Sequence, residues 1–397
     1  MNICILSRGH ISKTRGGVDK VTTTLAEELT RRGYSIYFVS QWAPDKSEKL
    51  GERSYILPEN KEYSEKNKEF LAELYKKNGI ELIINQADSI NLFNLIADSC
   101  GTIPIVSCIH SDPIYLIKGL QDCWDEWKLK KKWEFRILFP FYLAKILYIY
   151  HSRKKFLRNK YIELYSRSDA VILLSELFKK NFIRYSGIKD TSKLYAVPNP
   201  NTYLGYTGNT QAKEDLIIFV GRLDFQKRVD RLLKIWESAS REHKSWKLKI
   251  IGDGDHADFY KTYAKKLNLR NIEFVGHADP TEYYKKAKIL CMTSTHEGFG
   301  MVITEALQFN VIPMLYNSYE SCNDIIEDNK NGILITPFSI YEYVSRLIGL
   351  MEEPESIERI QDGIKRDNNE DKFNRIPIAN EWEKIIKRVT RKGRTLV

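Results

Sequence analysis

Residues 289–305 read ILCMTSTHEGFGMVITE, and this stretch decides the fold more than any other part of the chain. The apolar run Ile289–Met292 predicts a buried strand, and apolar residues at helical spacing after Gly300 predict a helix. A strand that passes through glycines into a helix directs backbone N–H groups and the positive end of the helix dipole at one spot. The stretch therefore predicts an α/β unit with an anion-binding site where the strand ends.

Two carboxylates flank this predicted site. Glu297 lies in the loop at the strand end, and Glu305 lies along the helix, roughly 8–12 Å away at a rise of about 1.5 Å per residue. A pair so far apart suits two separated parts of one ligand rather than one shared bond. We infer a nucleotide-sugar, with the sugar near Glu297 and the ribose near Glu305.

The composition is that of a soluble globular protein with about two or three domains: 397 residues, 43% hydrophobic and 29% charged. The apolar run Asn2–Leu6 is too short for a secretory signal peptide, and no apolar run approaches the ~20 residues of a membrane span. The six cysteines are scattered without a Cys-x-x-Cys pair, which favours free thiols over a metal site. We therefore expect a cytoplasmic protein.

Short apolar runs alternate with helical patterns in two series, separated by a proline-containing linker at Val197–Asn201. This rhythm predicts parallel sheets covered on both faces, hence an α/β fold of two tandem doubly wound domains that face each other across a cleft. The predicted domains are residues 1–198, residues 199–375 and a helix within 376–397 that packs back on the first domain. The predicted strands are 2–6, 35–39, 81–85, 103–108, 169–174, 216–220, 248–251, 272–275, 289–292, 312–315 and 333–335.

Glycines and polar residues follow many of these strands, at the sheet edge where doubly wound folds bind ligands. Gly16 and Gly17 let the backbone approach a ligand, although a plain tight turn explains them equally well. His110 can hydrogen-bond a sugar hydroxyl or a reacting group, and a structural histidine is the alternative. The turns at Gly252 and at Gly276-His277 line the nucleotide, or they are the short connections that any such fold needs.

Two cations follow the strand 216–220. Arg222 offers a planar fork of donors and Lys227 a compact charge, a combination suited to a diphosphate, whereas two solvated loop cations are the alternative. No Asp-x-Asp occurs among the strand ends, which argues against a carboxylate-bound divalent ion. We therefore expect no metal and no cofactor, with the two cations stabilising the charge of a departing phosphate.

The net charge of +10 is unevenly spread: between residues 128 and 160, eleven Lys and Arg residues accompany one acid, Glu134. These cations frame an apolar, tyrosine-rich run at 137–150. The pattern fits a helix lying on an anionic membrane surface at the inner face of the cell membrane. The alternative is a domain helix whose apolar face is core and whose lysines are solvated. Nucleic acid is disfavoured, because no recognised binding motif accompanies the charge.

Taken in order, these motifs resemble those of glycosyltransferase family 4, the retaining transferases with the GT-B fold of two Rossmann-like domains. The resemblance rests on Gly16-Gly17, His110, Gly221-Arg222-Leu223 with Lys227, Gly252-Asp253-Gly254, and Glu297 with Glu305. The family's usual Pro-Asn-Gly linker appears here as Pro198-Asn199-Pro200.

The resemblance implies roles for single residues. Arg222 and Lys227 would hold the donor diphosphate, Glu297 the sugar hydroxyls and Glu305 the ribose. His110 would sit beside the reacting sugar. Backbone N–H groups of four consecutive residues would serve the sugar and phosphate: Phe299, Gly300, Met301 and Val302.

These expectations combine into a retaining glycosyltransferase. It would move a hexose-type unit from a UDP-linked sugar to a lipid-linked or oligosaccharide acceptor in bacterial surface-polysaccharide biosynthesis, such as lipopolysaccharide or capsule. Two rivals stay open: a nucleotide-sugar epimerase of the same architecture, and a non-catalytic glycan- or membrane-binding protein.

Overall fold

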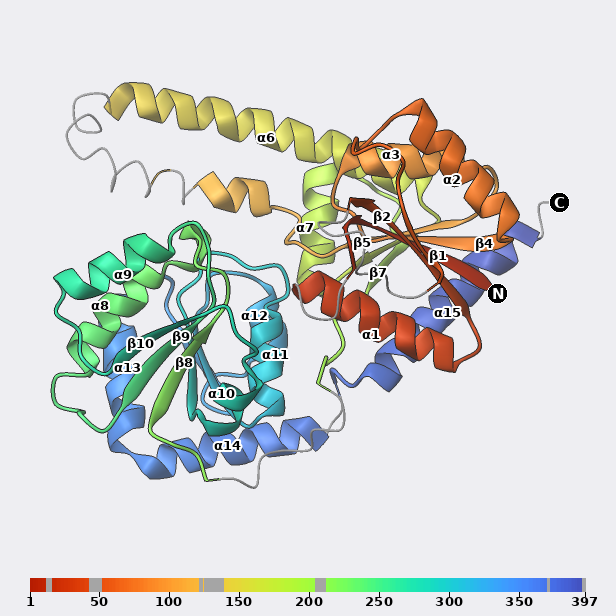
Figure 1. The fold of residues 1–397 in the computed structure, drawn as a ribbon. Coiled ribbons are helices and arrows are strands. Elements are labelled where there is room, and N and C mark those ends of the chain that lie inside the picture. Colours follow the sequence, from red (N-terminus) through yellow and green to blue (C-terminus); the bar gives the residue numbers. More distant parts are fainter. Residues whose placement is uncertain are drawn as a thin grey trace. The chain divides into compact units, whose positions relative to one another are not determined.

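Two parallel β-sheets organise the chain, each in its own compact unit (Figure 1). Unit 1 comprises Met1–Ile114, His151–Thr202 and Phe373–Val397, and unit 2 comprises Tyr115–Tyr150 and Tyr203–Lys372. The predicted α/β fold with two doubly wound sheets is confirmed. This computed structural model describes residues 1–11, 16–42, 52–120, 124, 139–203, 212–369 and 372–394.

The sheet of unit 1 has seven parallel strands in the order β3-β2-β1-β4-β5-β6-β7. The chain starts at β1, builds outward to β3, and then returns to build outward from β4. The direction of winding therefore changes between β1 and β4, which makes that position the switch point of the sheet. The strands are β1 (Asn2–Gly9), β2 (Ser35–Trp42), β3 (Ser54–Ile56), β4 (Ile80–Asn85), β5 (Ile105–Ile109), β6 (Ala170–Leu173) and β7 (Leu194–Ala196).

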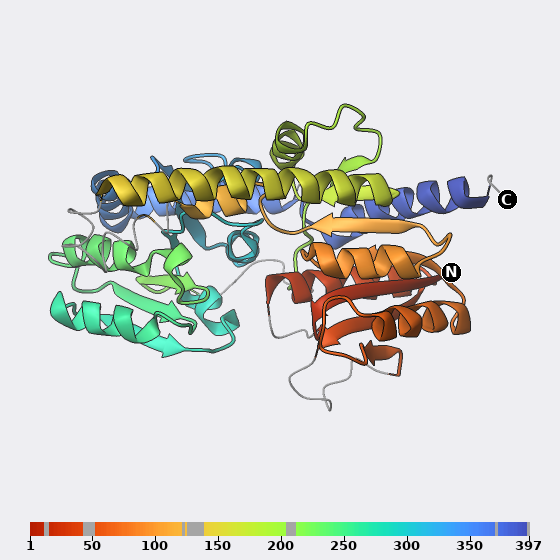
Figure 2. The ribbon, with the colours of Figure 1, turned by 90° about the horizontal axis from the view of Figure 1, so that it is seen from above.

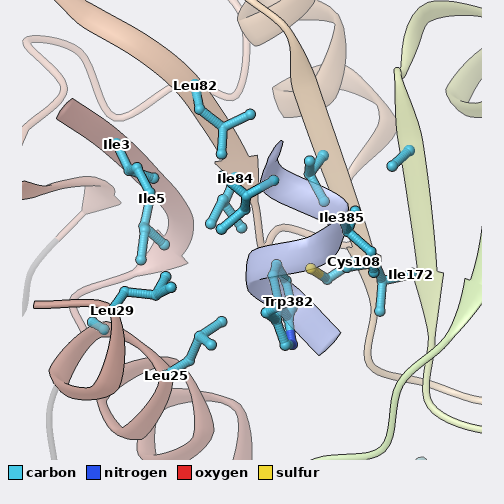
Figure 3. Close-up of a cluster of buried hydrophobic side chains, with 14 of the residues drawn as sticks. Ile3, Ile5, Leu25, Leu29, Leu82, Ile84, Cys108, Ile172, Trp382 and Ile385 are labelled. Atoms are coloured by element: carbon cyan, nitrogen blue, oxygen red, sulfur yellow. The ribbon is translucent and has the colours of Figure 1, made fainter. Parts of the chain in front are cut away.

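Unit 1 has its core between this sheet and two helices from opposite ends of the chain. Alternate residues of the strands, such as Ile3 and Ile5, face Leu25 of α1 (Gly17–Arg31) and Trp382 of α15 (Arg375–Arg394) (Figure 3). Burying a side chain of this size stabilises the fold by roughly 1.5–3 kcal/mol. The C-terminal helix is thus part of the core of unit 1.

Three further helices of unit 1 begin at serines. Ser64, Ser89 and Ser175 each accept a hydrogen bond from a first-turn backbone N–H, an N-cap that contributes about 1 kcal/mol. These caps fix where α2 (Glu65–Lys77), α3 (Ile90–Ser99) and α7 (Glu176–Ser186) begin.

Helix α6 (Phe139–Arg167) is 29 residues long and runs from unit 2 into unit 1 (Figure 2). It contains the described part of the basic, tyrosine-rich segment, whose residues 128–138 lie outside the described residues. Within the described ranges, no helix is both long and apolar enough to cross a membrane.

The sheet of unit 2 has six parallel strands in the order β10-β9-β8-β11-β12-β13, with its switch point between β8 and β11. Ile289 and Leu290 of β11 pair with Ile217 and Ile218 of β8. Nearly all residues of these two strands are buried, as expected for parallel strands covered on both faces. The strands are β8 (Leu216–Val220), β9 (Lys247–Ile251), β10 (Ile272–Gly276), β11 (Ile289–Met292), β12 (Ile312–Tyr316) and β13 (Ile333–Ile335).

Helices follow each strand of unit 2, and α8 packs against both α9 and α13 (Figure 1). A single 3₁₀ turn, η1 (Phe225–Lys227), lies between β8 and α8. The helices are α8 (Val229–Ala239), α9 (Ala257–Lys266), α10 (Thr281–Lys286), α11 (Met301–Gln308), α12 (Ser321–Ile325), α13 (Ile340–Glu352) and α14 (Pro354–Asn369).

Candidate active site

The loops that follow β8 and β11 meet at the carboxyl edge of the second sheet. The backbone N–H of Thr295 donates to the carbonyl oxygen of Gln226 (3.0 Å), and Gln226 Nε2 donates to the carbonyl oxygen of His296 (2.5 Å). Thr293 Oγ1 donates to the carbonyl oxygen of Lys227 (3.0 Å). These bonds fasten the two loops together at the switch point, so the side chains that they carry have fixed neighbours.

The structure brings Lys227 and Glu297 into direct contact. Lys227 Nζ donates to Glu297 Oε1 at 2.6 Å, and the two side chains are only 14% and 9% exposed. Arg222, the other predicted diphosphate ligand, does not join them. Its side chain is 81% exposed and lies 3.4 Å from Asp224. The two predicted cations thus differ, because one is enclosed at the site and the other lies on the surface beside it.

The start of α11 lies next to this ion pair. Gly300 takes the left-handed conformation (φ 81°) that ends the loop and begins the helix at Met301 and Val302. A Cβ on Gly300 would lie 2.8 Å from Ile303 Cδ1, a movable side-chain end, so the left-handed conformation is what favours glycine there. The first-turn N–H groups of a helix have no intrahelical acceptor, and they carry the positive end of its dipole. Phe299, just before, is buried at 3% exposure.

Glu305, the second carboxylate of the predicted pair, is buried at 3% exposure. Tyr284 donates its hydroxyl to Glu305 Oε2 (3.2 Å), and the ring of Tyr284 stacks on Phe309. Burial, together with the nearby charge of Glu305, raises the pKa of Tyr284 well above its ordinary value. The predicted contact of Glu305 with a ribose stays a prediction. Sequence patterns missed its partner Tyr284, which lies on a different helix.

The glycine turn after β9 nests against the loop after β8. Gly252 has φ 143°, and a Cβ there would lie 1.9 Å from the carbonyl oxygen of Gly221. Gly252 also donates its N–H to the carbonyl oxygen of Gly276 (2.8 Å). The neighbouring Gly276 has φ 82° with open space around it, and His277 is exposed. The glycine at 252 therefore lets two strand ends approach more closely than any side chain at that position allows.

Tyr319, which sequence analysis did not single out, lies against Glu297. Its side chain is 3% exposed, and its hydroxyl makes no hydrogen bond with a described residue. Burial, and after it the charge of Glu297, raises the pKa of Tyr319 well above its ordinary value. The hydroxyl also lies 3.7 Å from the position of a Cβ on Gly300. No motif marks this residue, because its place depends on β12 lying beside β11.

Three predicted site residues belong to unit 1. Gly16 is the N-cap of α1, with Gly17 as the first helical residue, and both are exposed at the carboxyl end of β1. His110 follows β5, where its Nε2 is hydrogen-bonded to Gln86 Oε1. Burial lowers the pKa of His110 to about 4, with Asp88 opposing the shift weakly. All three therefore lie at the carboxyl edge of the first sheet.

Without any residue of the first sheet, the second sheet has a carboxylate (Glu297), an ammonium group (Lys227) and a helix N-terminus (α11) at its switch point. A carboxylate accepts hydrogen bonds from hydroxyl groups, and the ammonium group and helix end favour an anion. The arrangement therefore suits a ligand that carries hydroxyls on one part and negative charge on another.

Two protein-family models match the chain. The model described as "Glycosyltransferase Family 4" covers residues 15–200, and the model described as "Glycosyl transferases group 1" covers residues 208–367. An uncharacterized glycosyltransferase of Haemophilus influenzae is 25% identical over 385 residues, which are 94% of this chain and 96% of that relative.

Solved structures resemble the chain over nearly its whole length. The lipopolysaccharide outer core galactosyltransferase WaaB in its apo form has a TM-score of 0.66 and 18% identity, over 97% of this chain and 99% of that one. HepE of Anabaena in complex with UDP-glucose has a TM-score of 0.74 and 15% identity, over 98% of this chain and 99% of that one. At these identities the likeness is one of fold, and that fold is GT-B.

Proposed function

The chain belongs to the family 4 glycosyltransferases, and on that premise we propose that it is a retaining hexosyltransferase of surface-polysaccharide assembly. The observation that carries the proposal is the Lys227–Glu297 pair at the switch point, within the stretch that the group 1 model matches. The proposed donor is a UDP-linked hexose, as in the HepE complex with UDP-glucose. The proposed acceptor is a lipid-linked or oligosaccharide glycan, in line with the lipopolysaccharide core named for WaaB.

The donor diphosphate is assigned to Lys227, the N-terminus of α11 and Arg222. Lys227 pairs with Glu297 in the loop that leads into α11, and the N-terminus of that helix favours an anion. Arg222 reaches the diphosphate by leaving Asp224, an exposed pair whose loss costs at most about 1 kcal/mol. On this proposal the two cations stabilise the leaving diphosphate, and the protein supplies no metal ion.

Glu297 is assigned to the sugar hydroxyls rather than to nucleophilic attack. Its Oε1 is occupied by Lys227, which lowers the nucleophilicity of that oxygen. We propose same-face displacement. The acceptor hydroxyl oxygen bonds to the anomeric carbon, the bond from that carbon to the β-phosphate oxygen breaks, and the acceptor proton passes to the departing phosphate. The products are a glycoside with retained configuration and UDP.

A donor screen tests this assignment. The chain is incubated with UDP-glucose, UDP-galactose, UDP-N-acetylglucosamine or UDP-N-acetylgalactosamine and a lipopolysaccharide-core or polyprenyl-diphosphate glycan acceptor, and released UDP is measured. NMR of the product then gives its anomeric configuration. We expect acceptor-dependent UDP release and an α-linked product, and a β-linked product would refute retention.

The same screen separates the two rivals. An epimerase converts the donor sugar into its epimer in the absence of any acceptor. A non-catalytic binding protein releases no UDP with any donor, and its glycan binding is unaffected by Glu297→Gln or Lys227→Met.

We also propose that the enzyme works at the inner face of a membrane, with α6 as its contact. The first half of the helix exposes Phe141 (63%) and Tyr148 (75%), and Phe156 (48%) is exposed farther along. Lys154, Lys155 and Arg158 are exposed in the second half, and none of them pairs with a carboxylate of a described residue. Apolar and aromatic side chains beside cations suit the headgroup region of an anionic bilayer.

Vesicle flotation tests this contact. We expect the chain to float with phosphatidylglycerol-containing vesicles and not with phosphatidylcholine vesicles. Replacing Lys154, Lys155 and Arg158 by glutamine is expected to release it, since each basic residue near such a surface contributes about 1 kcal/mol. The matched control replaces three exposed lysines of α9 (Lys261, Lys265 and Lys266). Equal flotation of both triple variants would contradict the assignment to α6.

A further inference from the structure

The surroundings of His110 determine which of its ring nitrogens carries the proton. His110 Nε2 faces Gln86 Oε1, which follows β4, the strand beside β5. An amide oxygen only accepts hydrogen bonds, so the contact requires a proton on Nε2. The Gln86 side chain is 5% exposed, and water does not compete for the bond. The ring is therefore held as the tautomer with a proton on Nε2.

The second ring nitrogen is left without a proton, and no described residue is its hydrogen-bond partner. His110 Nδ1 is buried and makes no hydrogen bond with any residue that the structure describes. Because burial keeps the pKa near 4, the ring is neutral at physiological pH and Nδ1 carries a lone pair. A buried acceptor without a donor is unusual in a folded protein, and it indicates a position that a ligand fills.

Gln86 is itself held in place from both sides. Its backbone N–H donates to the carbonyl oxygen of Leu6 in β1 (2.8 Å). Two residues on, Asp88 receives Lys160 Nζ of α6 at both its carbonyl oxygen (2.8 Å) and its Oδ1 (2.5 Å). Lys160 is 3% exposed, whereas the side chain of Asp88 is 39% exposed, so the clamp is buried on the lysine side. The loop from β4 that carries Gln86 is therefore fixed at Gln86 and again at Asp88.

We infer that Gln86 is a positioning residue that fixes His110 as the Nε2-protonated tautomer, so that Nδ1 accepts a hydrogen bond from a substrate hydroxyl. The inference rests on the proposed function only for the identity of that hydroxyl, which a sugar supplies. It assigns His110 the role of a neutral acceptor and excludes it as a proton donor to the leaving group. Among the described residues, Asp88 is the charged group that acts on the ring, and it pairs with Lys160; the buried Asp112 lies in the following loop.

The tautomer is read directly from NMR of the full chain labelled with ¹⁵N-histidine. Long-range ¹H–¹⁵N spectra distinguish a protonated from an unprotonated ring nitrogen. We expect His110, assigned from His110→Gln, to show the proton on Nε2 alone. His243 is an internal reference for a protonated Nδ1, because its Nδ1 faces the carbonyl oxygen of Ala239 at 2.9 Å, while its Nε2 faces Glu352 Oε1 at 3.1 Å. A proton on Nδ1 of His110, as on that of His243, would overturn the inference, whatever the activity of the enzyme.

Variants of Gln86 test its positioning role. In Gln86→Met we expect the single tautomer of His110 to become a mixture, and kcat/KM with the donor found active to fall about 3–10-fold, the value of one hydrogen bond. Gln86→Glu places a charge on Nε2–H, which raises the pKa of His110 and adds a histidine limb to the pH profile. The matched control is Gln41→Met, a buried glutamine of β2 that does not touch His110. An unchanged tautomer in Gln86→Met would refute the role of Gln86 without bearing on the proposed transfer reaction.

Discussion

Strands β8 and β11 carry an ion pair at each end, and the two pairs have the same length. At the amino ends, Lys288 Nζ lies 2.6 Å from Asp215 Oδ1, and at the carboxyl ends Lys227 Nζ lies 2.6 Å from Glu297 Oε1. The surroundings differ. The amino-end side chains are 24% and 38% exposed, whereas the carboxyl-end side chains are 14% and 9% exposed. The same kind of ion pair is thus partly exposed to solvent at the amino edge and nearly buried at the carboxyl edge.

This difference is the one expected between an ion pair kept for stability and an ion pair kept for a ligand. A half-exposed pair gains up to about 1 kcal/mol and needs no further explanation. An enclosed pair loses much of that gain to desolvation, and apolar residues of similar size often stabilise a fold as well or better. Lys227 and Glu297 are therefore poorly explained by stability alone. A ligand that binds both charges, as the proposed donor does, accounts for them.

The largest effect is expected on turnover. Glu297→Gln and Lys227→Met should each lower the rate of acceptor-dependent UDP release by about 10²–10³-fold, since each removes a charge aimed at the reacting donor. The amino-end variants Asp215→Asn and Lys288→Met should stay within about twofold of the unmodified enzyme. Thermal unfolding of all four variants checks that they are folded. Equal losses at both edges would contradict the distinction drawn between the pairs.

The second largest effect is expected on the stability of the glycine turns at the carboxyl edge of the second sheet. Gly252→Ala forces a Cβ to within 1.9 Å of the Gly221 carbonyl oxygen and should lower the free energy of unfolding by about 3 kcal/mol or more. Gly276→Ala is the matched control, because that glycine ends the adjacent strand at φ 82° with open space around it. Its cost should be only the left-handed conformation, about 1–2 kcal/mol. Urea unfolding followed by fluorescence measures both, and equal costs would show that the close approach of the two turns contributes nothing.

Sequence patterns predicted the fold because buried parallel strands are continuous β-branched runs that are easy to find. They missed β3 and β7, which have three residues each and form the two edges of the first sheet. Edge strands so short are half-buried and carry no periodic pattern. Their existence follows from pairing with β2 and β6, which sequence order does not reveal.

The candidate site was predicted unevenly for a similar reason. Lys227 and Glu297 were each predicted from the loop that carries them, but their contact was not, because it requires β8 and β11 to be neighbours. Gln86, Tyr284 and Tyr319 were missed entirely. Each lies in a segment without a motif and reaches a predicted residue across a strand or helix boundary. The residue types within one loop can be identified from the sequence. A contact between two loops depends on which strands are neighbours in the sheet.

The third effect extends the comparison to the first sheet, where His110, a titratable group with a buried Nδ1, follows β5 at the carboxyl edge. Its pKa is about 4 in the folded chain and about 6.5 when unfolded. Between those values the unfolded chain binds a proton that the folded chain does not, so stability rises with pH across this window and falls as the pH drops towards 4. The change should be about 2–3 kcal/mol, measured as urea midpoints of unmodified chain and His110→Gln. His243→Gln, a surface control paired with Glu352, should keep the pH dependence that His110→Gln loses.

The smallest effect is the direct energetic coupling within each ion pair. Double-mutant cycles with Lys227→Met and Glu297→Gln, and with Lys288→Met and Asp215→Asn, measure it in the enzyme without donor. We expect about 1–2 kcal/mol at the enclosed carboxyl edge, because water screens that pair less, and under about 1 kcal/mol at the amino edge. The double variant at the carboxyl edge should nevertheless be about as stable as the unmodified chain, since removing both charges also removes their desolvation cost. A large loss of stability in that double variant would mean that Lys227 and Glu297 are kept for folding, and the comparison between the two edges would then lose its functional meaning.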